Sequence, residues 1–234
     1  MKQGSQKHKR APTCTIPADV FRRIYLYTII GKFNNGVYGA VRLQKTAYIS
    51  ERNEHVVKPF SYKKHHFGEY SEQVDNIREQ LISLGFVKAL PLSTSLKFTI
   101  EFDGKSYDYV TGGNRYIISD TEIYELCKSV ISTSYPKLLK SVEQTIDQYG
   151  YKKEEDLLKC CYDFDEFKDK KDEDVIFETD LPDWVEISDI SDDVCDELTL
   201  MFTPSFINFV TMVTDGFERT TIEWEKVKKV VLPL

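Results

Sequence analysis

One local pattern constrains the fold of this 234-residue chain more than any other feature. Apolar residues alternate strictly with polar ones over positions 96–102, which is typical of a β-strand with one buried face. Asp103-Gly104 follows directly and favours a two-residue hairpin turn, and Tyr107 and Tyr109 continue the alternation on a return strand. The sequence therefore predicts a β-hairpin centred on Asp103-Gly104. The alternating apolar positions are Leu96, Phe98, Ile100 and Phe102.

Three helical segments precede this hairpin. The first covers about 17–30, with Pro17 in its opening turn and Gly31 as its stop, and the second covers about 39–52. The third begins after the capping residue Ser71 and ends at Gly85. Its apolar residues recur at helical spacing, at Val74, Ile77, Leu81 and Leu84. Three helices followed by a hairpin is the order of a winged helix, so we predict a mainly α, α+β fold with a winged-helix-like β-hairpin.

Helical periodicity resumes after a second turn at Gly112-Gly113. Ser119-Asp120-Thr121-Glu122 has the pattern of a capping box and predicts a helix start. Another helix is expected to open at Ser134, with Pro136 in its first turn, and to run to Gly150. A short helix is predicted over about 153–162, and residues 163–174 are charged enough to form a solvated linker.

Charge divides the chain into unequal parts. Residues 1–150 hold 21 Lys and Arg against 15 Asp and Glu, a net charge of +6, whereas residues 151–234 hold 10 against 23, a net charge of −13. This asymmetry indicates two functional regions. We predict a flexible basic leader over 1–16, a helical winged domain over 17–162, and an acidic linker and C-terminal extension over 163–234.

The cysteines and the hydropathy indicate a cellular location. Five cysteines are scattered without metal-ligand spacing, which favours reduced thiols in a cytoplasm over a disulfide framework. No stretch approaches the roughly 18 apolar residues that cross a bilayer, so no membrane partner is expected. The cysteines are Cys14, Cys127, Cys160, Cys161 and Cys195.

Signals for catalysis, cofactors and metals are weak. No glycine pattern matches a phosphate-binding loop, and the adjacent pair His65-His66 points to opposite faces of an extended segment. The Asp163–Asp169 run has Lys168 where a calcium loop needs glycine. We therefore expect a protein that is not an enzyme and has no cofactor and no metal.

Two segments are unusual for a purely structural role. The first is Arg42-Leu43-Gln44-Lys45-Thr46-Ala47-Tyr48-Ile49 in the second helix. The second is His66-Phe67-Gly68-Glu69-Tyr70-Ser71 before the third helix, which ends Leu84-Gly85-Phe86. Together they resemble the Panacea domain, a family that includes SocA-like antitoxins and YwgA-like proteins, over residues 18–150. The family's motifs are R-L-Q-K-hydrophobic-hydrophobic-Y, aromatic-G-P-Y-S and L-x-x-L-G-hydrophobic. The family's turn proline is Glu69 in this chain.

The resemblance implies an antitoxin-like or regulatory protein that binds a protein partner, in a toxin–antitoxin or mobile-element and phage-defence locus. Packing explains Gln44 and Lys45 least, so both are candidates for partner contact, together with Arg42 and Tyr48. The motif turn has roles in structure: Gly68 can supply a positive φ, Tyr70 can pack and Ser71 can cap, and Phe67 completes the motif.

Two alternatives remain open from the sequence. A DNA-binding winged-helix regulator would use the helix after Ser71, but Glu69, Glu72, Asp75 and Glu79 there oppose phosphate contact. The basic leader favours this alternative. The second alternative is a structural adaptor subunit of a multi-protein defence complex, and the C-terminal extension motivates this alternative.

Overall fold

The computed structural model describes residues 13–52, 54–65, 68–92, 96–102, 105–111, 113–164 and 170–203. The helices of the first half come in the predicted order: α1 (Ala18–Lys32), α2 (Ala40–Glu51) and α3 (Glu72–Ser83). Among the strands of this part of the chain are β2 (Val37–Tyr38), β5 (Val87–Pro91), β6 (Leu96–Phe102) and β7 (Lys105–Thr111). β8 (Asn114–Ile118) then returns to the body of the protein.

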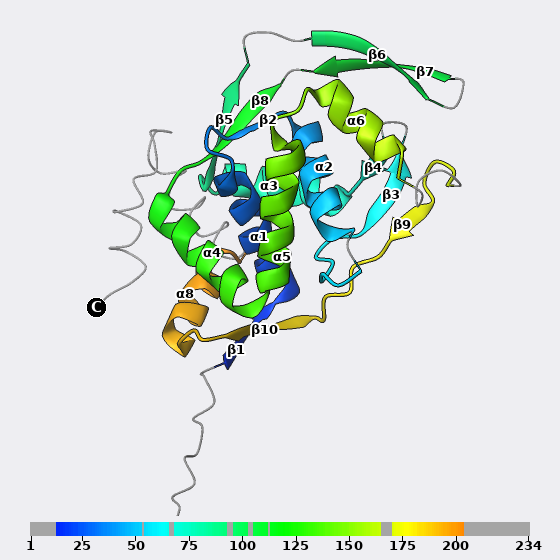
Figure 1. Ribbon diagram of the computed structural model, residues 1–234. Coiled ribbons are helices and arrows are strands. Elements are labelled where there is room, and N and C mark those ends of the chain that lie inside the picture. The colour runs from blue at the N-terminus through cyan, green and yellow to red at the C-terminus, as the bar shows by residue number, and fades with distance from the viewer. Residues whose placement is uncertain are drawn as a thin grey trace, which may run out of the picture.

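These elements have the arrangement of a winged helix. β8 lies between β2 and β5 in an antiparallel three-stranded sheet, and the β6–β7 hairpin extends from its edge as the wing (Figure 1). Phe102 pairs with Lys105 across the predicted turn, whose two residues lie outside the described part. The mainly helical α+β fold and its hairpin are therefore confirmed.

The start of α3 matches its sequence signals. The Ser71 hydroxyl accepts a hydrogen bond from the Val74 amide at 3.4 Å, which satisfies a donor that the helix leaves unpaired. Beyond the helix, Gly85 has φ of +75°, the left-handed conformation in which glycine costs least.

Three further helices pack on this domain: α4 (Thr121–Ser134), α5 (Pro136–Thr145) and α6 (Glu154–Tyr162). α4 packs on α1 and α5 on α2, and a π-helical turn, Ile146–Gly150, follows α5. Two predicted helix starts are wrong. Asp120, and not Ser119, caps α4, because its carboxylate accepts from the amides of Glu122 at 2.8 Å and Ile123 at 3.0 Å. Ser134 ends α4, and α5 begins after Tyr135.

The core surrounds α1 and α2. Every residue from Val20 to Ile30 of α1 and from Arg42 to Glu51 of α2 is buried, so both helices are covered on all sides. A helix that is buried on all sides differs from an amphipathic surface helix, which has one apolar face in the core and one polar face in solvent. Polar residues on these helices must therefore find partners inside the protein.

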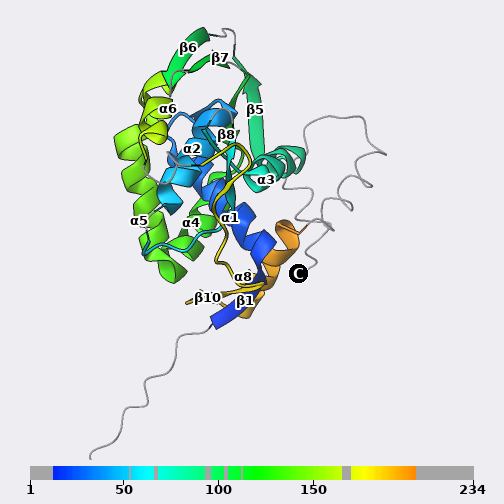
Figure 2. The same ribbon diagram turned by 90° about the vertical axis from the view of Figure 1, so that its right-hand side faces the viewer.

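The C-terminal segment is built into the same fold. β9 (Val175–Phe177) pairs with β3 (Tyr62–His65), which also pairs with β4 (Gly68–Tyr70), and β10 (Trp184–Ser188) pairs with β1 (Thr13–Pro17). α8 (Asp192–Met201) packs on β1 (Figure 2). The structure differs from the predicted boundaries in two places. Residues 13–16 belong to the paired strand β1, and the elements β9, β10 and α8 of the C-terminal segment contact the first half of the chain.

The cysteines differ from the prediction of reduced thiols. Cys14 on β1 and Cys195 on α8 form a disulfide that spans 181 residues of sequence. Cys127 and Cys161 are free and buried, and burial raises the pKa of both thiols, which disfavours the reactive thiolate. None of the described helices is long and apolar enough to cross a membrane.

Candidate functional site

The two sequence motifs meet in space, because side chains of α2 bind the turn between β4 and α3. Gln44 makes two hydrogen bonds to the backbone of Ser71: its amide nitrogen donates to the carbonyl at 2.9 Å and its amide oxygen accepts from the N–H at 3.1 Å. The side chain thus satisfies both backbone groups of the residue that caps α3. We call the contact of Gln44 and Lys45 with residues 68–71 the α2–turn joint.

Lys45 makes the second contact of this joint. Its ammonium donates to the Glu69 carbonyl and to Glu69 Oε2, each at 2.8 Å, and the two side chains are 2% and 0% exposed. The second carboxylate oxygen, Oε1, is buried and has no partner among the described residues. A buried ion pair with one unsatisfied oxygen depends on its counterion, because the carboxylate left behind would be uncompensated. Glu69, the departure from the family's proline, therefore supplies the charge that Lys45 needs.

Gly68 leaves room for the Lys45 ammonium. A β-carbon at this position would lie 2.7 Å from Lys45 Nζ, and the residue has φ of +90°. Both facts require glycine here. The Tyr70 hydroxyl donates to Asp75 at 2.8 Å, and burial together with this carboxylate raises the pKa of Tyr70 to about 12. The turn is thus held from α2 on one side and from α3 on the other.

The remaining predicted site residues are also internal. Arg42 donates to the carbonyls of Gly150 and Lys152, each at 2.8 Å, and burial lowers its pKa. Tyr48 is fully buried and stacks on Phe177 of β9, with ring centroids 5.6 Å apart. Phe67 lies outside the described residues.

These positions correct the predicted partner-contact residues. Arg42, Gln44, Lys45 and Tyr48 are at most 9% exposed, so their side chains offer no surface to a partner in this conformation. The reason is that α2 packs against α5, α6 and β4, and every residue from Arg42 to Glu51 is buried. The motif residues hold the protein together.

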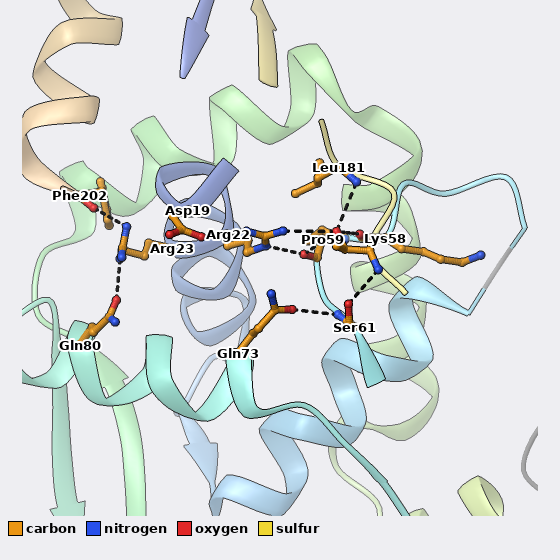
Figure 3. A network of polar contacts seen from close by, with 11 residues as sticks. Asp19, Arg22, Arg23, Lys58, Pro59, Ser61, Gln73, Gln80, Leu181 and Phe202 are labelled. Carbon is orange, nitrogen blue, oxygen red and sulfur yellow. Dashed lines mark hydrogen bonds and ion pairs between the residues drawn. The ribbon is translucent and has the colours of Figure 1, made fainter. Parts of the chain in front are cut away.

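A second polar network, missed by the sequence analysis, fastens the C-terminal segment to α1 (Figure 3). Arg22 Nε donates to the Pro59 carbonyl at 2.7 Å. Arg23 donates to Gln80 Oε1 of α3 at 2.8 Å and to the Phe202 carbonyl at 3.0 Å, and burial lowers its pKa. Two adjacent arginines inside a helix of high apolar content were the available signal, because buried guanidinium groups need several acceptors.

A buried carboxyl on α2 was also missed. Glu51 is fully buried and accepts from the Phe60 amide at 3.1 Å and the Tyr62 hydroxyl at 3.4 Å. Burial raises its pKa well above 4.5, which favours the neutral acid. No group of three or more His, Cys, Asp or Glu in the described part of the chain could hold a metal ion.

Comparisons with protein-family models, with curated proteins and with solved structures find no match to this chain. Together, the fold and the two internal networks describe a mainly helical α+β protein with its motif residues inside and its C-terminal segment fastened to its first helix.

Proposed function

We propose that this chain is a non-catalytic, cytoplasmic module that binds another protein, of the antitoxin-like or regulatory type. The observation that carries the proposal is the charge on α3, the helix that enters the DNA groove in DNA-binding winged helices. Its exposed residues include Glu72 and Glu79, and Arg78 is paired with Asp75 at 2.6 Å and with Glu79 at 2.7 Å. Phosphate contact needs free cations, so this helix suits a protein partner better than a duplex.

A row of side chains on the winged sheet, in which half-buried Arg115 lies between exposed Tyr38 and Leu90, supports a protein partner. Tyr38 of β2, Arg115 of β8 and Leu90 of β5 lie side by side in the strand register. Tyr38 is 44% exposed and Leu90 is 39% exposed. Arg115 donates to the Tyr38 hydroxyl at 3.3 Å, which holds the guanidinium across the sheet. Tyrosine and arginine are the residue types that most often dominate binding energy at protein interfaces.

The resemblance to the Panacea domain gives the class of partner. Its motif residues form the α2–turn joint in this chain, so the resemblance supports a shared fold and, through it, a toxin or another protein of the same locus as the partner. A basic toxin surface would also meet the acidic C-terminal half, whose net charge is −13.

DNA binding is the second candidate, because the winged-helix arrangement itself and the net charge of +6 over residues 1–150 favour it. A structural adaptor role in a defence complex is a third form of protein binding. It predicts a stable assembly of several subunits in place of a toxin pair.

Titration calorimetry against the product of the adjacent gene tests the proposal. We expect a stoichiometric complex that the double variant Tyr38→Ala, Arg115→Glu weakens by at least about tenfold, since truncated hot-spot residues cost 2 kcal/mol or more. The control Lys137→Glu changes an exposed cation on α5 and should leave the affinity unchanged. Nanomolar, strongly salt-dependent binding to a random duplex, with no protein complex, would overturn the proposal in favour of DNA.

A further inference from the structure

One covalent bond joins the first and last elements that the structure describes. Cys14 lies on β1, opposite Ile187 of β10, and Cys195 lies in α8, which packs against β1. The two Cα atoms are 6.5 Å apart. Figures 1 and 2 both place β1, β10 and α8 together at one end of the molecule. The bond therefore ties the start of the fold to its last described helix.

The end of α8 covers an aromatic surface between α1 and α3. Phe202 is fully buried and stacks on Phe86, with ring centroids 4.5 Å apart and planes at 9°. The Tyr27 ring lies 6.1 Å from Phe202 on the α1 side. Arg23 of α1 donates a hydrogen bond from Nη1 to the Phe202 carbonyl and another from Nε to Gln80 Oε1 of α3. Phe202, the residue after α8, thus packs against Tyr27 of α1 and Phe86, which follows α3, and α8 covers this aromatic surface.

The cover depends on its attachments. α8 has ten residues, and an isolated helix of this length is marginal in water. Its first turn carries Asp192 and Asp193, which suit a helix N-terminus. Besides the packing of Leu198 and its contact with β1, α8 is held by the docking of Phe202, the Arg23 contact, the preceding β1–β10 pairing and the disulfide.

We propose that Cys14 and Cys195 form a reversible redox site that fixes α8 over the Tyr27–Phe86 surface when oxidised and releases it when reduced. This proposal goes beyond protein binding, and it rests on the cytoplasmic location that the proposed function includes. Disulfides are rare in a reducing cytoplasm, except where they are transient or redox-sensing. A pair held at bonding distance by β1 and α8 suits such a site.

The reductant is a dithiol, and its attack is assigned to Cys14, because the residue Cys14 is half-buried whereas Cys195 is 4% exposed. A thiolate of the dithiol attacks Cys14 Sγ, the S–S bond breaks, and Cys195 leaves as a thiolate that takes up a proton. The second thiol of the reductant then attacks the mixed disulfide and releases the Cys14 thiolate. Two electrons pass to the protein pair, and the dithiol becomes a disulfide.

Hydrogen exchange of the full chain, oxidised or treated with dithiothreitol, tests the proposal. Differential alkylation should label Cys14 and Cys195 only after reduction. Amides of α8 should then exchange at least about tenfold faster, whereas those of α1 keep their protection. Cys195→Ser should behave like the reduced protein in either condition. Cys160→Ser, which removes a half-buried free thiol, should respond to reduction as the unchanged chain does.

Three results would overturn the proposal. The first is full alkylation of Cys14 and Cys195 after treatment with a disulfide oxidant. The second is equal exchange of α8 in both states, which would show that docking alone holds it. The third is loss of protection throughout α1 on reduction, which would make the bond a structural staple of the whole fold and not a switch.

Discussion

Replacing Lys45 with methionine should destabilise the protein strongly, because it leaves the Glu69 carboxylate buried without its counterion. The carboxylate is 0% exposed, and its Oε1 has no other partner among the described residues. Breaking a buried ion pair in this way costs about 3–5 kcal/mol in the free energy of unfolding. For a chain of this size, each kcal/mol lowers Tm by roughly 2–4 °C, so we expect a fall of roughly 6–20 °C.

Urea denaturation with thermal melting as a second probe measures this change. Lys63→Met is the matched control, because Lys63 is 51% exposed and contacts Glu173 at 3.9 Å, and exposed pairs contribute about 0–1 kcal/mol. The double variant Lys45→Met, Glu69→Leu should recover part of the loss, since no charge remains buried. The Glu69 carbonyl would still lack a donor, which costs about 1–3 kcal/mol.

The result that refutes this reasoning is a loss below about 1 kcal/mol for Lys45→Met, equal to that of the exposed control. Such a result would mean that Lys45 is free to reach solvent and that the joint is open. It would also restore Lys45 as a candidate for direct partner contact.

Three further predictions rest on single contacts. Glu51→Gln should flatten the dependence of stability on pH. In the unchanged protein the folded state keeps a proton that the unfolded chain releases near pH 4.5, so the free energy of unfolding falls by up to about 1.4 kcal/mol per pH unit between that pH and the raised pKa of the folded state. Urea midpoints of both proteins at pH 5 and pH 7 measure this fall and its absence in the variant. Asp120→Ala should cost about 1 kcal/mol in a urea titration, while Ser119→Ala, beside it but outside the cap, should cost less. Gly68→Ala should lower Tm by several degrees, because its β-carbon would lie 2.7 Å from Lys45 Nζ, and an unchanged Tm would contradict the described turn.

Local signals predicted much of the fold. The cap at Ser71 and the glycine at position 85 mark α3 correctly, and strict alternation with Asp103-Gly104 marks the wing. Both depend on residues that are neighbours in sequence, where propensity and turn chemistry act directly. The Ser119 cap was wrong by one residue: α4 begins at Thr121, so Asp120 stands at the N-cap and its carboxylate accepts from the amides of Glu122 and Ile123.

Contacts between distant segments were not predictable from these signals. Lys45 and Glu69 are 24 residues apart, and local signals gave Lys45 no packing role, although it lies buried on a helix that packs against α6 and β4. β1 and β10 pair across the whole domain, and nothing in five scattered cysteines indicated that Cys14 would meet Cys195. Such pairings depend on the packing of the complete chain.

The site was predicted in part. The two motifs were correctly singled out as unusual, but their polarity was interpreted as surface chemistry. The structure assigns Gln44 to the backbone of Ser71 and Lys45 to Glu69, which explains why polar residue types stand at buried positions. The row of Tyr38, Arg115 and Leu90 has no motif, since it forms only when three strands align.

Affinity purification of the tagged chain from its native host, with mass spectrometry of the co-eluting material, tests the central claim most directly. We expect one protein, encoded by a neighbouring gene, in stoichiometric amount, and its loss from the Tyr38→Ala, Arg115→Glu variant. Elution with nucleic acid alone, or with no partner, would contradict the account of this winged-helix protein as a protein-binding module.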